Sequence, residues 1–354
     1  MTTDPQRMHA SCGTARVELV APAEAVAEFG RMAGDFVRLT PAAADDRPPP
    51  ALVQVATRAP RGDGWRRLAY SSDYEPDRVV WVDDARRRIA VVGEPSEWRA
   101  QQTLRSVRHL LRWQVYAAGD LLLHGGLVRM DGRGVAFAGA KRSGKTSSIL
   151  SALVHGGADF VSNDDLTVGE TPDGALRGYG SPRTVNVRTD ALLALAESAP
   201  AVARLLTDST HPTNSFEGRH RTAEALHTAS GAALPGSLWV RAGELCATVG
   251  CDAVPESRVD AVVFPRFEDR PDGPALVRLD REQSAAELRH HMEDRGTKYD
   301  PFLADWYPHT DAARRARLCE RLLDEAVFFR MSQHMHGLRE ATAALRDALR
   351  AVPA

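Results

Sequence analysis

The sequence predicts an α/β protein in which a small β-rich region, residues 1–96, precedes a larger region, residues 97–354, where strands alternate with helices around a glycine-rich loop. Three observations lead to this fold class. Short apolar and β-branched runs separated by turn residues fill the first region. In the second region an apolar strand, a glycine-rich loop and an amphipathic helix follow one another directly. The length of 354 residues suits two domains.

Composition places the chain among ordinary folded proteins. Hydrophobic residues make up 43% and charged residues 26%, which excludes a disordered or fibrous chain. No apolar run is long enough to span a membrane, and the N-terminus lacks the apolar core of a signal peptide, so we expect a cytoplasmic protein without a membrane partner. The four cysteines are sparse and match no zinc pattern. A net charge of −2 gives no electrostatic reason to expect nucleic-acid binding.

The N-terminal region carries strand signals and no cluster of chemically active residues. Turn-rich segments, such as residues 45–50 and 61–64, separate its apolar runs. We interpret it as a small β-rich domain, with docking of a peptide or partner along a free strand edge as the alternative. Strands are expected at residues 15–20, 51–55, 67–70, 79–82 and 88–92.

The larger region begins with an amphipathic helix at residues 97–118, whose apolar residues share one helical face. A second helix is expected at 145–155, ended by two glycines, and a third at 191–206. The polar segment 207–230 has the composition of a loop or lid, and further helical runs finish the chain. Strands are expected at residues 121–124, 126–130, 135–138, 159–161, 166–170, 175–179, 259–264 and 327–331.

Residues 139–146 match the pattern G-x-x-x-x-G-K-[ST] between a strand and a helix, the context of a phosphate-binding loop. Glycines let successive backbone N–H groups face a polyphosphate, and Lys145 supplies a movable positive charge. Only three of the 45 Lys and Arg residues are lysines, and two of them lie in this loop. The expected nucleotide site comprises Gly139, Ala140, Lys141, Arg142, Ser143, Gly144, Lys145, Thr146 and Ser147.

The loop alone does not define a reaction. No Asp-x-x-Gly switch follows it, which argues against a GTPase, and no Ser-Gly-Gly signature of a transporter ATPase is present. His124 precedes the loop by 15 residues, and the pair Asp164-Asp165 follows the next helix and strand. In isolation the carboxylates would also suit a polar turn and the histidine a structural role. Their common spacing around the loop favours a catalytic site.

Three arginines are weaker candidates for this site. Arg183 and Arg188 follow the Asp pair and could contact phosphate, although either would also be an ordinary surface arginine. Arg219, in the polar segment, could reach an acceptor if a lid closes.

The motifs together resemble the HPr kinase/phosphorylase family and its wider set of bacterial HPr-kinase-like proteins. Members show His-Gly-x-Leu-Val, then the phosphate loop, a helix ending in glycine, a strand closing on Asp-Asp, and Arg-Gly-x-Gly, which stands here at residues 177–180. The likeness covers about residues 121–187, and a weaker one extends through 259–266 and the last 30 residues. It implies a compact α/β kinase core related to phosphoenolpyruvate carboxykinase that uses ATP and Mg²⁺.

The resemblance also implies roles for individual residues. Asp164 would be the general base, and Asp165 would hold Mg²⁺ together with Thr146. His124 would steady a phosphate or the aspartate, and Lys145 would complete the catalytic set. Independently, a nearby Mg²⁺ and Lys145 can keep two adjacent carboxylates ionised.

Two departures from the family pattern refine this interpretation. The family usually has a metal-binding Glu before Arg-Gly-x-Gly, where this chain has Ala175-Leu176, and the phosphate loop is less glycine-rich. With the unusual N-terminal region, these differences argue against the carbon-regulation enzyme itself. Similar kinase-like proteins are associated with modification of ribosomally made peptides.

We therefore expect a kinase that phosphorylates a Ser or Thr hydroxyl of a peptide or small protein. A small-molecule hydroxyl kinase and a catalytically inactive nucleotide-binding scaffold stay open as alternatives, as does a homo-oligomer.

Overall fold

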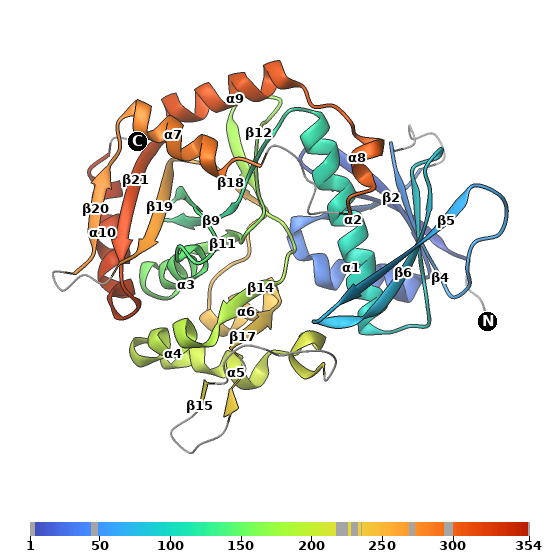
Figure 1. Cartoon of the computed structure of the whole chain (residues 1–354), viewed down its shortest axis with the longest axis horizontal. Helices are drawn as coiled ribbons and strands as arrows, with labels where there is room; N and C mark the ends of the chain where they lie inside the picture. Colours follow the sequence, from blue (N-terminus) through green and yellow to red (C-terminus); the bar gives the residue numbers. More distant parts are fainter. Residues whose placement is uncertain are drawn as a thin grey trace. The chain divides into compact units, whose positions relative to one another are not determined.

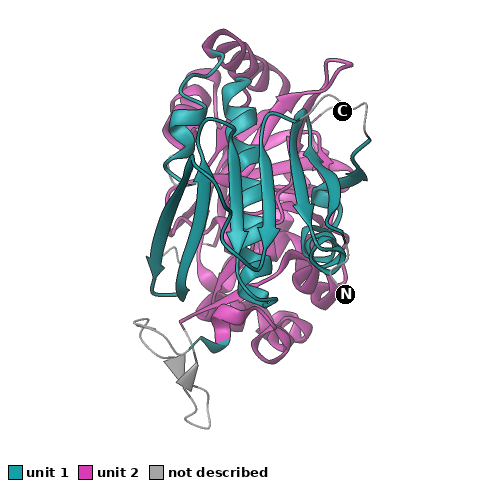
Figure 2. Ribbon diagram, turned by 90° about the vertical axis from the view of Figure 1, so that its right-hand side faces the viewer, with its two compact units in different colours: residues 1–119, 215–221, 295–311 teal, residues 120–214, 222–294, 312–354 magenta. Residues whose placement is uncertain are grey.

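The computed structural model describes residues 4–43, 49–216, 226–227, 233–234, 236–268, 273–293 and 300–352. It is a mixed α/β protein whose described helices and strands belong to two compact units (Figure 1, Figure 2). The first unit comprises residues 1–119, 215–221 and 295–311, and the second comprises 120–214, 222–294 and 312–354. None of the described helices is long and apolar enough to cross a membrane.

A seven-stranded mixed sheet with the order β3-β1-β2-β4-β7-β6-β5 forms the first unit. The parallel pairs β2–β4 and β4–β7 lie in the middle, and the outer pairs are antiparallel. Alternate residues of β2 are buried on one face because successive side chains of a strand point to opposite sides. All five expected strands are confirmed. The strands are β1 (Gln6–Cys12), β2 (Ala15–Ala21), β3 (Arg38–Pro41), β4 (Leu52–Ala56), β5 (Trp65–Ser72), β6 (Glu75–Asp83) and β7 (Arg88–Val92).

Two long helices accompany this sheet. Helix α2 (Glu97–Ala117) was expected. Ser96 caps its N-terminus, because the Ser96 hydroxyl accepts a hydrogen bond from the Arg99 backbone N–H at 3.2 Å. The helix packs on β2, β4 and β7. Helix α1 (Ala23–Ala33) corrects the expectation of strands and loops alone. Its buried residues, Ala25, Val26, Phe29 and Ala33, recur at helical spacing and so share one face of the helix. A short helix, α8 (Leu303–Trp306), also belongs to this unit.

The second unit contains a six-stranded sheet with the order β11-β9-β10-β19-β21-β20. Strands β10, β19 and β21 are parallel, so their carboxyl ends lie at one edge of the sheet. Ligands of open α/β sheets bind outside such an edge, and the glycine-rich loop leaves β10 there. The strands are β9 (Gly125–Met130), β10 (Arg133–Ala138), β11 (Asp159–Ser162), β19 (Ala261–Phe267), β20 (Ala275–Arg278) and β21 (Val327–Gln333).

A four-stranded sheet of the same unit has the order β18-β13-β12-β8. One buried apolar core contains side chains of both sheets, including Leu121 and Leu166 from the smaller sheet and Leu127 and Phe264 from the larger one. The chain therefore crosses between two sheets that share a core. The strands are β8 (Leu121–Leu123), β12 (Leu166–Glu170), β13 (Leu176–Tyr179) and β18 (Glu256–Ser257).

Helix α3 (Lys145–Gly156) follows the loop, as expected, and packs on β9 and α10 (Leu338–Arg350). The expected helix at 191–206 is wrong in its length. Helix α4 (Thr189–Ser198) ends before Pro200, which begins a 3₁₀ turn (Pro200–Arg204) because proline has no N–H to continue the helix. The remaining helices are α5 (Leu205–Asp208), α6 (Ala242–Val249), α7 (Arg281–His291) and α9 (Ala312–Glu325).

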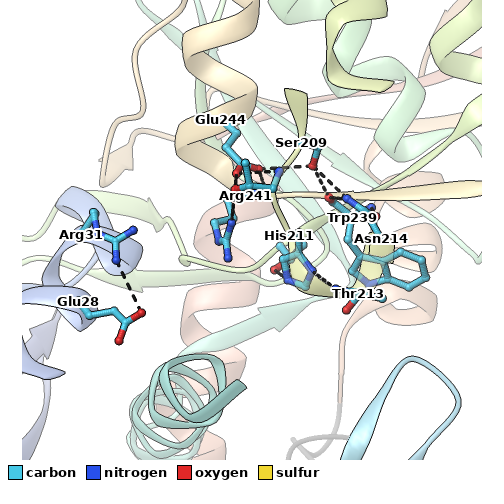
Figure 3. A network of polar contacts seen from close by, with 11 residues as sticks. Glu28, Arg31, Ser209, His211, Thr213, Asn214, Trp239, Arg241 and Glu244 are labelled. Carbon is cyan, nitrogen blue, oxygen red and sulfur yellow. Dashed lines mark hydrogen bonds and ion pairs between the residues drawn. The ribbon is translucent and has the colours of Figure 1, made fainter. Parts of the chain in front are cut away.

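The first part of the expected loop or lid at 207–230 is tied to its own unit. Ser209 Oγ donates to the Trp239 carbonyl at 2.7 Å, and the Asn214 side chain exchanges hydrogen bonds of 2.8 and 2.9 Å with the Trp239 backbone (Figure 3). Arg219 lies outside the described residues. The strands of this region are β14 (Val185–Arg188), β15 (Leu226–His227), β16 (Ala233–Leu234) and β17 (Ser237–Val240).

Candidate active site

The glycine-rich loop joins β10 to the first residue of α3, Lys145. Gly144 has a φ of +102°, and a Cβ atom there would lie 2.9 Å from both the Phe267 ring and the Gln333 amide nitrogen. Glycine is required at this position for its backbone conformation and for the close packing against the ends of β19 and β21. The helix N-terminus is thereby held against the carboxyl edge of the sheet.

Lys145 is buried and folds back over the loop. Its Nζ donates to the carbonyl oxygens of Gly139 at 2.8 Å and Ala140 at 2.9 Å. The ammonium group therefore lies at the loop itself, where bound phosphate oxygens could replace the carbonyls as its partners.

The remaining loop residues differ in exposure. Ala140, Lys141 and Arg142 are exposed at the tip, whereas Ser147 is buried in the first turn of α3. Within the described part of the chain, the buried Ser143 hydroxyl has no hydrogen-bond partner.

Two crossings between the sheets bring chemically active side chains together. His124 lies between β8 and β9, and Asp164 and Asp165 lie between β11 and β12, so each segment links the smaller sheet to the larger one. His124 Nε2 is 2.9 Å from Asp164 Oδ1. The two crossings therefore bring His124 into contact with Asp164, the first aspartate of the pair.

Arg183 joins both carboxylates. Its Nη2 lies 2.9 Å from Asp164 Oδ2, and its Nη1 donates to Asp165 Oδ1 at 2.6 Å. Asp165 is 1% exposed, whereas the Asp164 side chain is 30% exposed and can be reached by a substrate. Arg188, the other arginine considered, pairs instead with Asp190.

The surroundings of Asp164 keep it ionised. Burial by itself would raise the pKa of this carboxyl, but the hydrogen bond from His124 and the charge of Arg183 outweigh it and lower the pKa to about 2. Asp164 also has a φ of +68°, a left-handed conformation that aspartate tolerates better than most residues. The chain thus adopts a sparsely populated backbone conformation at the residue with the lowered pKa.

Thr146 points toward the same region. Its Oγ1 donates to Asn163 Oδ1 at 3.2 Å, directly before the aspartate pair in the chain. The hydroxyl, amide and carboxylate oxygens of Thr146, Asn163 and Asp165 are the hard donors that Mg²⁺ prefers. Among the described residues, no group of three or more His, Cys, Asp and Glu side chains is arranged to hold a metal. A nucleotide-bound Mg²⁺ needs fewer protein ligands because phosphates and waters complete its coordination, so the donor set fits this ion.

His291, at the end of α7, is a neighbour of this site that the sequence did not indicate. The His124 backbone N–H donates to the His291 carbonyl at 3.1 Å. The imidazole is buried, and this burial is the main reason that its pKa is lowered to about 4. The neighbouring basic side chains of His290, Lys145 and His124 act in the same direction, and the Glu287 carboxylate opposes them. His291 is therefore neutral at pH 7 beside the loop lysine. No sequence motif includes it: His291 is one of three basic residues in the last turn of a polar helix.

Leu176 lies where the resemblance implies a metal-binding glutamate. Leu176 is 5% exposed and belongs to the core shared by the two sheets. It cannot supply a metal ligand.

The sequence matches no family model and no curated protein. Among solved structures, the HPr(Ser) kinase/phosphatase from Coxiella burnetii is similar at 12% sequence identity and a TM-score of 0.28, over 65% of this chain and 88% of that chain.

Proposed function

We propose that this protein is an ATP- and Mg²⁺-dependent kinase that transfers the γ-phosphate to a hydroxyl group, with a Ser or Thr of a peptide or small protein as the acceptor. The observation that carries the proposal is the contact of Asp164 with His124 and Arg183 beside a phosphate-binding loop. The Thr146–Asn163 hydrogen bond connects the loop helix to that cluster. The resemblance of the sequence motifs to HPr-kinase-like proteins supports the same assignment.

The loop would bind the triphosphate. Lys145 Nζ would exchange its two carbonyl partners for oxygens of the outer phosphates, and these charge-assisted hydrogen bonds are stronger than the ones they replace. The left-handed Gly144 leaves backbone N–H groups at the start of α3 facing the anion. Nucleotide affinity would therefore depend on the lysine and on the shape of the loop.

Asp164 would accept the proton of the acceptor hydroxyl. As the hydroxyl O–H bond breaks, its oxygen forms a bond to the γ-phosphorus, the bond from that phosphorus to the β-phosphate oxygen breaks, and ADP leaves. His124 holds one carboxylate oxygen, which leaves the oxygen near Arg183 to receive the proton. A pKa of about 2 makes a weak base, and its basicity would rise if Arg183 turned toward the transferring phosphate.

Thr146 and Asp165 would hold Mg²⁺, whose charge would neutralise the phosphate oxygens. Asp165 is paired with Arg183 in this structure, so it would exchange a guanidinium for the metal. In this way Arg183 becomes available to phosphate when the metal is bound.

A nucleotide-binding scaffold without catalysis is the second candidate function. The buried apolar Leu176, where the family has a metal-binding carboxylate, favours it. The intact contact of His124 with Asp164 favours the kinase.

Release of ADP from Mg-ATP distinguishes the two functions. We expect the rate to rise when Ser- or Thr-containing peptides are added, with phosphate found on the peptide. A rise with small alcohols or sugars alone would move the acceptor to the small-molecule class. ATP binding measured by calorimetry without acceptor-dependent ADP release from any acceptor would support the scaffold and contradict the kinase.

A further inference from the structure

Two cysteines lie at the two ends of the turn that terminates α6. Gly250, after the last helical residue, has the left-handed φ and ψ of +79° and +39°. The backbone N–H groups of Gly250 and Cys251 both donate to the Cys246 carbonyl, at 2.8 and 3.1 Å. In a helix end of this kind, the residues joined by the outer hydrogen bond bring their side chains into contact. The turn therefore places the Cys246 and Cys251 side chains against each other.

The two thiols differ in exposure and in acidity. Cys246 is 5% exposed, whereas Cys251 is partly open to solvent, and neither is in a disulfide. A hydrogen bond between the two thiols raises the pKa of Cys246 and lowers that of Cys251. The carboxylates of Asp159 and Asp252 face the pair and oppose ionisation of both thiols. Cys251 is thus the thiol that a solvent-borne oxidant meets first, with Cys246 behind it.

We propose that Cys251 and Cys246 form a thiol pair that hydrogen peroxide converts to a disulfide. The Cys251 thiolate attacks one peroxide oxygen, the O–O bond breaks, and sulfenic acid and hydroxide form. The Cys246 sulfur then attacks the Cys251 sulfur, and the S–O bond breaks to release water. Overall, two thiols and one peroxide become one disulfide and two waters, with both sulfurs oxidised and both peroxide oxygens reduced.

The pair is attached to the strand that precedes the aspartate cluster. The residues after Cys251 pair with β11: the Phe160 N–H donates to the Asp252 carbonyl, and the Val254 N–H donates to the Phe160 carbonyl, each at 2.8 Å. Strand β11 ends one residue before Asn163. A disulfide at the end of α6 would therefore stiffen the segment that borders β11.

Peptide mapping of the full-length protein tests the proposal directly. Trypsin cleaves after Arg241 and Arg258, so both cysteines fall in one peptide, residues 242–258. After treatment with peroxide and then with N-ethylmaleimide, we expect this peptide to carry no label and to be lighter by two hydrogens than the reduced peptide. When a reductant is added between the two treatments, both cysteines should be labelled. Cys319 provides the internal comparison because burial raises its pKa and should keep it slow to oxidise.

Two substitutions assign the order of attack. In Cys246→Ser, peroxide should leave a Cys251 sulfenic acid that dimedone captures, whereas in Cys251→Ser the buried Cys246 should react with neither reagent. The proposal would be overturned if peptide 242–258 of the peroxide-treated wild type still carried two N-ethylmaleimide labels under conditions that oxidise Cys12 or Cys319. A dimedone adduct on Cys246 rather than Cys251 would also contradict it.

Discussion

His124 Nε2 and Asp164 Oδ1 lie 2.9 Å apart, although the two residues are 40 positions apart in the chain and belong to different crossings between the two sheets of one unit. Each crossing is short, and the shared apolar core fixes both sheets. The core therefore positions the imidazole and the carboxylate relative to each other.

Asp164→Asn should preserve Mg-ATP affinity and lower the rate of phosphoryl transfer by about 10²–10⁴-fold, the usual contribution of a general base. The amide keeps the shape of the carboxylate, and asparagine also tolerates the φ of +68°, so the backbone is not disturbed. Steady-state kinetics with a confirmed acceptor measures the change. Asp190→Asn, which removes the carboxylate partner of Arg188, should leave the rate unchanged. Near wild-type turnover of Asp164→Asn at saturating Mg²⁺ would exclude this residue as the base.

Asp165→Asn should fail in a different way. The substitution removes one of the two oxygen donors assigned to Mg²⁺, so the metal concentration for half-maximal rate should rise. A magnesium titration of the wild type and both aspartate variants measures it. Equal metal dependence in wild type and Asp165→Asn would remove this residue from the metal site.

Lys145→Ala should abolish the thermal stabilisation that Mg-ATP confers on the wild type. The substitution removes the buried ammonium group at the loop, and with it the main positive charge offered to the outer phosphates. Melting curves with and without Mg-ATP measure the shift. Lys145→Arg is the matched variant: it keeps the charge but not the compact ammonium, so we expect partial recovery at most. A full nucleotide-induced shift in Lys145→Ala would place the nucleotide elsewhere.

Gly144→Ala should destabilise the protein more than Gly157→Ala does. Both glycines have positive φ, which costs an L-residue about 1–2 kcal/mol. A Cβ atom at Gly144 would also meet Phe267 and Gln333, whereas one at Gly157 would meet nothing within 4 Å. Urea unfolding of the two variants separates the cost of the conformation from that of the contact. Equal losses would show that the Phe267 and Gln333 side chains can move away from Gly144 without cost.

The free energy of unfolding should decrease as the pH falls from about 6.5 to about 4, partly because of His291. Its pKa is lowered to about 4 in the folded state, so the unfolded chain binds more protons throughout this range and stability rises with pH. One such group contributes at most about 1.4 kcal/mol per pH unit. His291→Asn should reduce the slope without removing it, since burial also lowers the pKa of His109 to about 4. An unaltered slope in His291→Asn would show that this imidazole is not held neutral.

Local chemistry explains which features the sequence could predict. The strands of the first unit follow from alternating or continuous apolar runs bounded by turn residues, and the glycine-rich loop follows from a pattern of adjacent residues. Helix α1 was missed although its buried residues Ala25, Val26, Phe29 and Ala33 recur at helical spacing. The break at Pro200 was missed because the apolar pattern continues through it. The expected division into domains at residue 96 and the lid at 207–230 stay predictions.

The sequence by itself determined the mixed α/β class, the loop and the spacing of His124 and the aspartate pair around it. The tertiary structure decided that Arg183 rather than Arg188 joins both carboxylates, and that His291 lies beside Lys145. The reason is physical: a motif constrains residues that neighbour one another along the chain. Contacts between separate segments depend instead on how two sheets pack on a common core.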